Sequence, residues 1–253
     1  MELLHRYLAA NKQELPPITG RDVWQVSRSF PTMTVAPDGW HPRTFSLLGE
    51  TGRELLARQL MIWEAAGMWP HSNSTIHMSS QRKPAGGRRL IGWYRAAFRL
   101  WSAIRGEHWR EWEMKHATES FFGAAKRNSV LDVGWRQGVR AEFSQAKGTS
   151  TAIVAQDLRK CYELIRFVIL VEQGIKHFFL LLMLRTTVLS YGWKRHIVIG
   201  ACISMPIQAW RGMVVGCIAA TRELKAYLKD ALLEVTLRHP RVYLDTRDGR
   251  PKH

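Results

Sequence analysis

One short apolar run near the middle of the chain constrains the fold more than any other feature. Thr151-Ala-Ile-Val-Ala155 is apolar and partly β-branched, and the carboxylate of Asp157 follows it two residues later. Val and Ile favour strands, and an apolar run this short is consistent with a strand buried on both faces. We therefore expect an interior strand that ends in a carboxylate.

Segments with helical spacing lie on both sides of this predicted strand. Apolar residues recur at intervals of three and four along residues 51–67, 94–115, 130–143, 159–172, 175–191 and 213–233. We expect a capping box between Thr51 and Glu54, a helix end near Gly67, and helix breaks around Gly106 and Gly174. The Trp side chains between residues 93 and 112 have helical spacing, which favours a place in the core.

Turn signals predict a small sheet beside these helices. Residues 74–91 are expected to form a hairpin around the turn at residues 84–87, and residues 194–204 a strand or second hairpin. A last strand is predicted at residues 241–245. The proline-rich stretch of residues 18–42 is expected to be an extended lead-in. Helices mixed with short strands indicate an α+β fold that is rich in helix, with a short antiparallel sheet.

Composition favours a folded, basic protein. The 253 residues are 46% hydrophobic, which is enough for a core, so we expect one main domain of residues 37–253 after an N-terminal extension of residues 1–36. The three cysteines form no CxxC pair, which argues against a disulfide framework or a zinc finger. The absence of a signal-peptide pattern and of a long apolar run predicts a nuclear or cytoplasmic protein without a membrane partner.

The charge balance points to a polyanionic partner. Lys and Arg number 37 and Asp and Glu 21, so the net charge is +16. Arginine suits bidentate phosphate contacts and stacking on bases, which makes nucleic acid the leading partner. A solvated basic surface without any ligand is the alternative. The short signatures of nucleotide hydrolases, esterases, zincins and dinucleotide enzymes are all missing.

The segment around the predicted strand resembles a known polymerase motif. Ala152-Ile-Val-Ala-Gln-Asp-Leu-Arg-Lys-Cys-Tyr-Glu163 resembles motif A of reverse transcriptases, especially those of non-long-terminal-repeat retroelements and group II introns. The resemblance implies that Asp157 binds the catalytic Mg²⁺ pair and that Tyr162 is the steric gate against ribonucleotides. Hard Mg²⁺ prefers such oxygen ligands, and two bridged ions stabilise both oxygens of an in-line displacement. As alternatives, Asp157 is a helix N-cap and Tyr162 a core residue.

Two segments nearer the N-terminus resemble the same family, in the expected order. Ala36-Pro-Asp-Gly-Trp-His-Pro-Arg43 is similar to the motif that precedes the fingers. Lys83-Pro-Ala-Gly-Gly-Arg-Arg-Leu-Ile-Gly92 is similar to the fingers hairpin, which implies that Lys83 and Arg89 hold the triphosphate of the incoming nucleotide. Leu90 replaces the usual proline, which weakens the geometry but leaves the charges. A solvated basic turn is the alternative.

The C-terminal third contains one more similar segment and one that departs from the family. Arg211-Gly-Met-Val-Val-Gly-Cys-Ile-Ala-Ala220 resembles motif B, which implies that Gly212 and Gly216 support the template and the nucleotide. Alternatively, these glycines belong to an ordinary loop and a tight helix contact. Motif C, usually Tyr-x-Asp-Asp, is either damaged at Tyr243-Leu-Asp245-Thr246 or cut off after Asp245, so Asp245 is only a possible metal ligand.

Together the resemblance covers residues 37–245. It implies the fingers and part of the palm of a right-hand polymerase, without a thumb, acting as an RNA-directed DNA polymerase on an RNA template, a DNA primer and deoxynucleoside triphosphates with Mg²⁺. Because the second carboxylate pair is missing or altered, we expect this chain to be inactive or nearly so. A non-catalytic basic RNA- or DNA-binding protein is the competing hypothesis.

Overall fold

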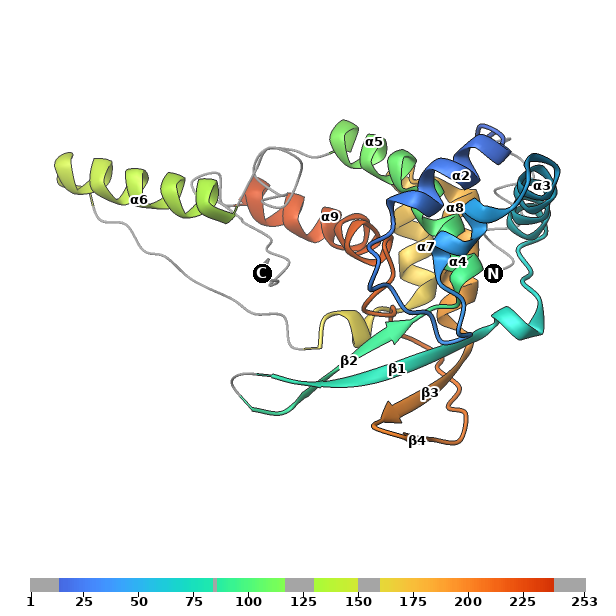
Figure 1. Cartoon of the computed structure of the whole chain (residues 1–253). Coiled ribbons are helices and arrows are strands. Elements are labelled where there is room, and N and C mark those ends of the chain that lie inside the picture. Colours follow the sequence, from blue (N-terminus) through green and yellow to red (C-terminus); the bar gives the residue numbers. More distant parts are fainter. Residues whose placement is uncertain (1–13, 84–85, 117–129, 150–159, 239–253) are drawn as a thin grey trace.

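The computed structural model describes residues 14–83, 86–116, 130–149 and 160–238, and it is an α+β protein. Apart from α6, which stands at a distance from the rest, its helices gather on one side of a small sheet that extends into a long hairpin (Figure 1). The α-helices are α2 (Gly20–Ser29), α3 (Glu50–Ala66), α4 (Ala96–Ile104), α5 (Gly106–His116), α6 (Val130–Ala146), α7 (Phe167–Lys176), α8 (Leu181–Tyr191) and α9 (Ala220–Arg238). The short 3₁₀ helices are η1 (Pro42–Leu47), η2 (His71–Asn73) and η3 (Tyr162–Leu164). The predicted strands at residues 151–157 and 241–245 lie outside the described residues.

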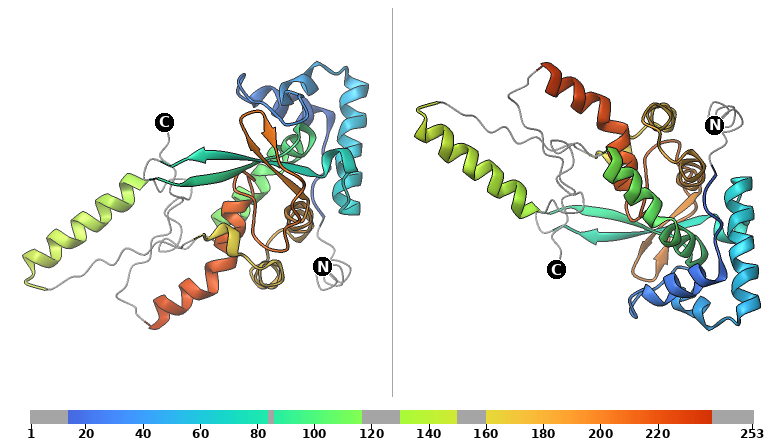
Figure 2. Two further views of the ribbon diagram at one scale, coloured as in Figure 1. Left: turned by 90° about the horizontal axis from the view of Figure 1, so that it is seen from below. Right: turned by 90° about the horizontal axis from the view of Figure 1, so that it is seen from above.

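The sheet has four strands in the order β2-β1-β3-β4, namely β1 (Thr75–Arg82), β2 (Arg88–Trp93), β3 (Lys194–Ile199) and β4 (Cys202–Ile203). Both expected hairpins are confirmed, since β1 pairs antiparallel with β2 and β3 with β4. Figure 2 shows β1 and β2 running away from the helices together. The expectation of a purely antiparallel sheet is wrong, because β1 and β3 are parallel. Parallel neighbours need a long crossover, which here runs through the helices between them.

The C-terminal end of helix α3 agrees with the sequence prediction, and its N-terminal start does not. Gly67 adopts a positive φ of 66° directly after the last helical residue, which glycine does without steric cost. The expected capping box at Thr51 is wrong, since the N-cap is Gly49 and has no side-chain capping bond. Glu54 instead accepts a 2.8 Å hydrogen bond from the backbone amide of Gly20. The carboxylate is thus used to attach α2 to α3.

The expectation that residues 18–42 are extended is wrong in part, because this proline-rich segment contains helix α2. Thr19 caps α2 in a complete capping box with Asp22, whose carboxylate accepts a 2.9 Å hydrogen bond from the Thr19 backbone amide. Such a box satisfies two of the free amides at a helix start. Val23 of this helix is completely buried in the main core.

Two further boundaries differ from expectation. Gly174 lies inside α7 and does not break it. Its missing side chain makes room for α8, since a Cβ there would lie 2.5 Å from Leu184 Cδ2. The turn comes four residues later at Phe178, whose φ is +52°. The helix expected from residue 213 begins only at Ala220, because the residues before it form a loop.

Aromatic rings fill the centre of the molecule. The break expected around Gly106 is confirmed, and Trp101 of α4 and Trp109 of α5 pack edge to face across it, 5.9 Å apart. Both rings have no exposed surface, as the helical Trp spacing predicts. Phe98 and Trp69 extend this cluster. Buried aromatic pairs of this kind contribute about 0.5–1.5 kcal/mol each beyond the area they bury.

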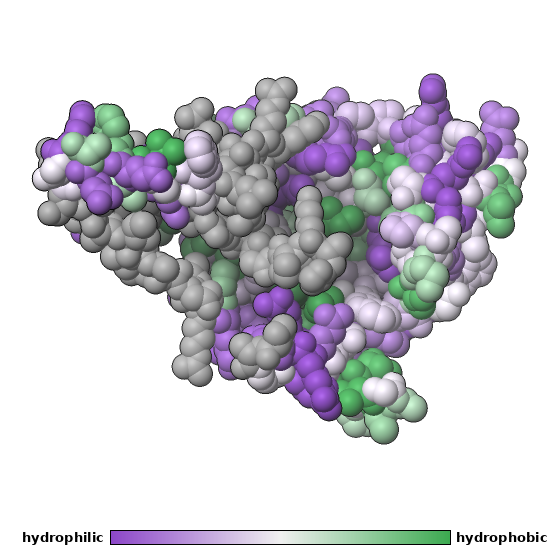
Figure 3. Space-filling view, turned by 60° about the vertical axis from the view of Figure 1, so that its left-hand side comes forward, coloured by the Kyte–Doolittle hydropathy of each residue, from purple (hydrophilic) through white to green (hydrophobic). Residues whose placement is uncertain are grey.

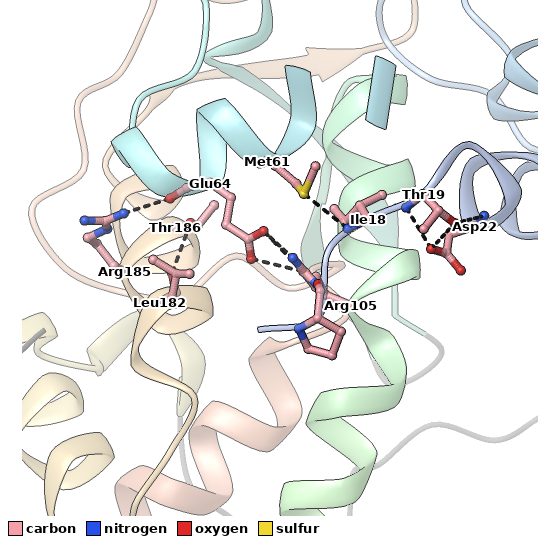
Figure 4. A network of polar contacts seen from close by, with 10 residues as sticks. Ile18, Thr19, Asp22, Met61, Glu64, Arg105, Leu182, Arg185 and Thr186 are labelled. Atoms are coloured by element: carbon pink, nitrogen blue, oxygen red, sulfur yellow. Dashed lines mark hydrogen bonds and ion pairs between the residues drawn. The ribbon is translucent and has the colours of Figure 1, made fainter. Parts of the chain in front are cut away.

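A buried ion pair ties the helices together (Figure 4). Arg105 donates from Nη2 to Glu64 Oε2 over 2.6 Å, and both side chains are almost completely buried. Arg105 also donates to the Pro16 carbonyl oxygen over 2.8 Å, and Arg185 donates to the Glu64 carbonyl oxygen over 2.7 Å. One cluster therefore joins the N-terminal segment, α3, α8 and the C-cap of α4. Among the described residues, no helix is both long and apolar enough to span a membrane.

Candidate functional site

The loop before α9 packs directly against the segment that follows the predicted catalytic strand. The Tyr162 carbonyl oxygen accepts a 2.8 Å hydrogen bond from the Met213 amide. The Ile165 carbonyl oxygen accepts another of 2.8 Å from the Gly212 amide. Two segments that each resemble a polymerase motif are thus adjacent, although about fifty residues separate them in the sequence.

Gly212 is at the point of closest approach between these segments. Its φ is +87°, and a Cβ there would lie 2.8 Å from the Glu163 carbonyl oxygen and 3.0 Å from the Glu163 Cα. Backbone atoms cannot move aside as a flexible side chain can. The glycine is therefore required by both its backbone conformation and its neighbour.

The other end of the same loop interlocks with β2. The Gly92 amide donates a 2.6 Å hydrogen bond to the Val215 carbonyl oxygen. A Cβ on Gly216, whose φ is +113°, would collide with the Gly92 carbonyl oxygen, and a Cβ on Gly92 would collide with Val214 Cγ1. Two glycines on facing segments therefore permit the contact. Tyr162, both candidate motif B glycines and the base of the β1–β2 hairpin form one site.

The Tyr162 side chain faces α9. It is half-buried against the core, and its hydroxyl lies 3.4 Å from Thr221 Oγ1 in the first turn of that helix. The ring thus has an observed packing role, as the structural alternative proposed. The predicted role of Tyr162 as a steric gate is untested, since Asp157 and the rest of residues 150–159 lie outside the described residues.

The hairpin carries the other predicted ligands at its far end. Lys83 and Arg89 are exposed, as are Arg82 and Arg88 beside them. Gly86 and Gly87 both have positive φ, and the Lys83 amide donates to the Gly87 carbonyl oxygen over 3.1 Å, which closes the turn. No Asp or Glu occurs anywhere in residues 74–95, so no carboxylate of this segment neutralises these cations. The β1–β2 hairpin, called the basic arm below, is hydrophilic in the space-filling view. The apolar β3–β4 hairpin projects below it (Figure 3).

Arg195 of β3 supports the loop from behind, and its sequence pattern did not reveal this role. Its Nη2 donates to the Tyr191 carbonyl oxygen over 2.7 Å and to the Gly212 carbonyl oxygen over 2.9 Å. Burial lowers the pKa of Arg195, while the neighbouring Tyr94 and Tyr191 raise it. The contact of Gly92 with the loop was not predicted from the sequence either, although Gly92 is the last residue of the basic segment 83–92.

The segment around Asp38 has an observed structural function. Its Oδ2 accepts a 3.1 Å hydrogen bond from the Ala96 amide, at the first residue of α4. An aspartate at this point satisfies a free amide and complements the positive end of the helix dipole. This motif is therefore attached to the first turn of α4.

The predicted metal ligands lie outside the described part of the chain. Asp157 falls within residues 150–159 and Asp245 within residues 239–253, so neither is placed. Among the described residues, no group of three or more His, Cys, Asp or Glu side chains lies together as a metal site would require. The Mg²⁺ expectation therefore depends on these two carboxylates.

Comparisons with known proteins leave the family open. No protein-family model matches the chain, and no curated protein matches it.

Proposed function

We propose that the chain is a fingers and partial palm region of the reverse transcriptase type, related to polymerases that copy RNA with deoxynucleoside triphosphates. One observation carries this proposal: the Tyr162 segment, the Gly212–Gly216 loop and the base of the basic hairpin are bonded together through backbone hydrogen bonds. These are three of the segments that resemble the family, and they are distant in sequence. If the three segments resembled the family by chance, there would be no reason for them to lie in contact in the folded chain.

The basic hairpin supplies the anion-binding part of the proposal. Exposed guanidinium groups on a rigid two-stranded arm suit phosphate oxygens, because Arg binds them in a bidentate manner. Lys83 and Arg89 are proposed to bind the triphosphate of a nucleotide or the backbone of a nucleic acid.

The chemistry itself is assigned to Asp157. Mg²⁺ held there would stabilise charge on the oxygens of an in-line nucleotidyl transfer. An altered or incomplete second carboxylate pair would leave the two ions under-coordinated, and one missing preorganised group typically costs about 3 kcal/mol of transition-state stabilisation. We therefore propose weak or absent polymerisation by this chain, with nucleic-acid binding retained.

Primer extension tests the catalytic part. Wild-type protein and Asp157→Asn are compared on an RNA template with a DNA primer, deoxynucleoside triphosphates and Mg²⁺. Extension that disappears in the variant supports the assignment, and equal extension by both proteins refutes it. If extension occurs, Tyr162→Ala should raise ribonucleotide incorporation, and an unchanged sugar preference would refute the gate.

A second candidate function is nucleic-acid binding without catalysis, which the carboxylate-free basic arm favours. It predicts no extension by either protein together with binding that depends steeply on salt. Binding is measured by fluorescence anisotropy with a labelled duplex between 50 and 200 mM salt. Lys83→Gln with Arg89→Gln should flatten the log–log salt slope by about 1.8, since each lost phosphate contact is worth about 0.9.

The matched control removes the same number of charges elsewhere. Arg21 and Arg58 are exposed on α2 and α3, away from the hairpin tip (Figure 1). Arg21→Gln with Arg58→Gln lowers the net charge equally and should leave the slope nearly as in wild type. Equal loss in both double variants would mean that charge alone, and not the hairpin, binds the nucleic acid.

A further inference from the structure

One carboxyl group is buried beneath the loop and plays no part in the proposed chemistry. Glu223 lies in the first turn of α9 and has no exposed surface. Its Oε1 accepts a hydrogen bond from the Thr187 hydroxyl and its Oε2 one from the Tyr191 hydroxyl, both on α8. The group therefore links the two helices.

The surroundings of Glu223 contain weak acids and no paired cation. Tyr191 faces it from α8, Cys217 from the loop, and Tyr94 from the segment between β2 and α4. Arg195 interacts with both tyrosines and donates to backbone oxygens. None of the ion pairs within the described residues includes Glu223. Only the two hydroxyl donors therefore offset the desolvation cost of charging this carboxyl group.

Burial favours the neutral, protonated form of the Glu223 carboxyl group. Burial raises the pKa of Glu223 from 4.5 to about 7, against the two hydrogen bonds, which lower it. Burial also raises the pKa of Cys217 to about 12, so that thiol stays neutral across the same range. Glu223 is thus the group of this cluster that changes charge near neutral pH.

Tyr191, the last residue of α8, connects the Glu223 carboxyl group to the residue 212–219 loop. Tyr191 donates from its hydroxyl to Glu223, while its carbonyl oxygen accepts from Arg195, which also binds the Gly212 carbonyl oxygen. Cys217 follows Gly216 directly, and the Ala219 carbonyl oxygen accepts from the Glu223 amide over 2.9 Å. A change in α8–α9 packing therefore reaches both ends of the loop.

We propose that Glu223 is a pH-responsive latch: its neutral form holds α8 on α9 and closes the residue 212–219 loop on Tyr162 and β2, and its ionised form releases that loop. The proposal goes beyond the proposed function and does not depend on it. It needs only the buried cluster and the two glycine-mediated contacts of the loop.

The sign follows from the two protonation states. Glu223 binds its proton more tightly in the closed state than in an opened state, where its pKa returns toward 4.5. The closed state is therefore fully favoured below this lower value and loses its advantage as the pH rises through about 7. Opening increases by about tenfold per pH unit within this window and is constant above it.

The reactivity of Cys217 measures the opening. Cys161→Ser with Cys202→Ser leaves Cys217 as the single thiol, and 4,4′-dithiodipyridine labels it at pH 5.5 to 8. The labelling rate of this protein is divided by the rate of the same protein with Glu223→Gln, which cancels the intrinsic pH dependence of thiol chemistry. The charge of Glu223 raises the pKa of Cys217, which would slow labelling, so faster labelling reports opening.

We expect the ratio to rise about tenfold per pH unit up to about pH 7 and then to be constant. A ratio that stays flat from pH 5.5 to 8 overturns the proposal. Glu172→Gln, which neutralises an exposed carboxylate of α7, should keep the wild-type profile. Loss of the pH dependence in that control would also overturn the assignment to Glu223.

A second measurement covers the case in which Glu223→Gln does not fold. Hydrogen exchange of the amides of residues 212–220 in the wild-type protein is recorded over the same pH range and corrected for intrinsic exchange rates. Protection should decrease up to about pH 7 in this segment and remain in α4. Protection that is independent of pH in residues 212–220 contradicts the latch.

Discussion

Replacing Gly216 with alanine tests the contact on which the candidate site depends. Gly216 has a φ of +113°, and a Cβ there would collide with the Gly92 carbonyl oxygen at the base of the hairpin. The substitution adds one methyl group and changes no charge or hydrogen-bonding group. Any effect therefore comes from the backbone conformation and from the close approach of β2.

The expected cost has two parts. A non-glycine residue held in such a region costs about 1–3 kcal/mol. Inserting a methyl group into a tight contact costs about another 1–3 kcal/mol, because the neighbouring backbone must shift. We therefore expect Gly216→Ala to lower the free energy of unfolding by about 4 kcal/mol, a large share of the stability of a domain of this size.

Gly200 provides the matched control. It also has a positive φ, of 59°, but its missing side chain would meet nothing within 4 Å. Gly200→Ala should show the conformational cost alone, about 1–2 kcal/mol. The difference between the two variants contains the contact between the loop and β2 together with the extra strain of a φ of +113° over one of +59°.

Urea unfolding followed by tryptophan fluorescence and circular dichroism measures both variants under identical conditions. The midpoint should fall much further for Gly216→Ala, with an unchanged slope against urea. If Gly216→Ala costs no more than Gly200→Ala, the loop does not touch β2 as described. The convergence that supports the proposed function would then be refuted as well.

Three smaller changes test other parts of the structure by urea or thermal unfolding. Asp38→Ala should cost about 1 kcal/mol because α4 loses its cap, and an unchanged stability would disprove the cap. Arg105→Met should cost about 3–5 kcal/mol because Glu64 is left charged and buried, and adding Glu64→Met should recover part of the loss; strict additivity would contradict the pairing. Tyr162→Phe should cost less than about 1 kcal/mol, since its hydroxyl contact is long and half-buried, and a larger loss would show a stronger role for that hydroxyl.

Local patterns in the sequence were sufficient for the elements that depend on neighbouring residues. The β1–β2 hairpin was predicted because strand residues flank a Pro-Gly turn, and the buried Trp101 and Trp109 because their spacing matches a helix face. The helix end at Gly67 followed from the glycine alone. In each case the determining residues lie within one or two helical turns of each other.

The predictions of local structure were wrong where contacts with residues distant in the sequence determine that structure. Gly174 was expected to end a helix, but Leu184 of the next helix packs on it, so the missing side chain serves close packing. Glu54 was expected to cap its own helix and instead binds the Gly20 amide. The parallel pairing of β1 with β3 joins segments more than a hundred residues apart, for which no local pattern exists.

The site was predictable in part for the same reason. Gly212 and Gly216 could be named from the sequence through the resemblance of residues 211–220 to motif B, in which such glycines permit close backbone approach. Their partners, Glu163 and Gly92, could not, since either contact requires the folded chain. Arg195 was likewise invisible, because its role consists of two bonds to backbone oxygens, which any long donor could supply.

The two glycine contacts also determine what the basic arm can do. Gly92 is the residue before the last one of β2, and it is bonded and interlocked with the loop that binds the Tyr162 segment. The orientation of the hairpin is therefore set at its base, by the same loop that is hydrogen-bonded to the Tyr162 segment. The first five residues of β1 are also paired with β3, which holds the base of the hairpin from its other side. The cations proposed to bind phosphate therefore stand on an arm that is anchored at its base by both the loop and β3.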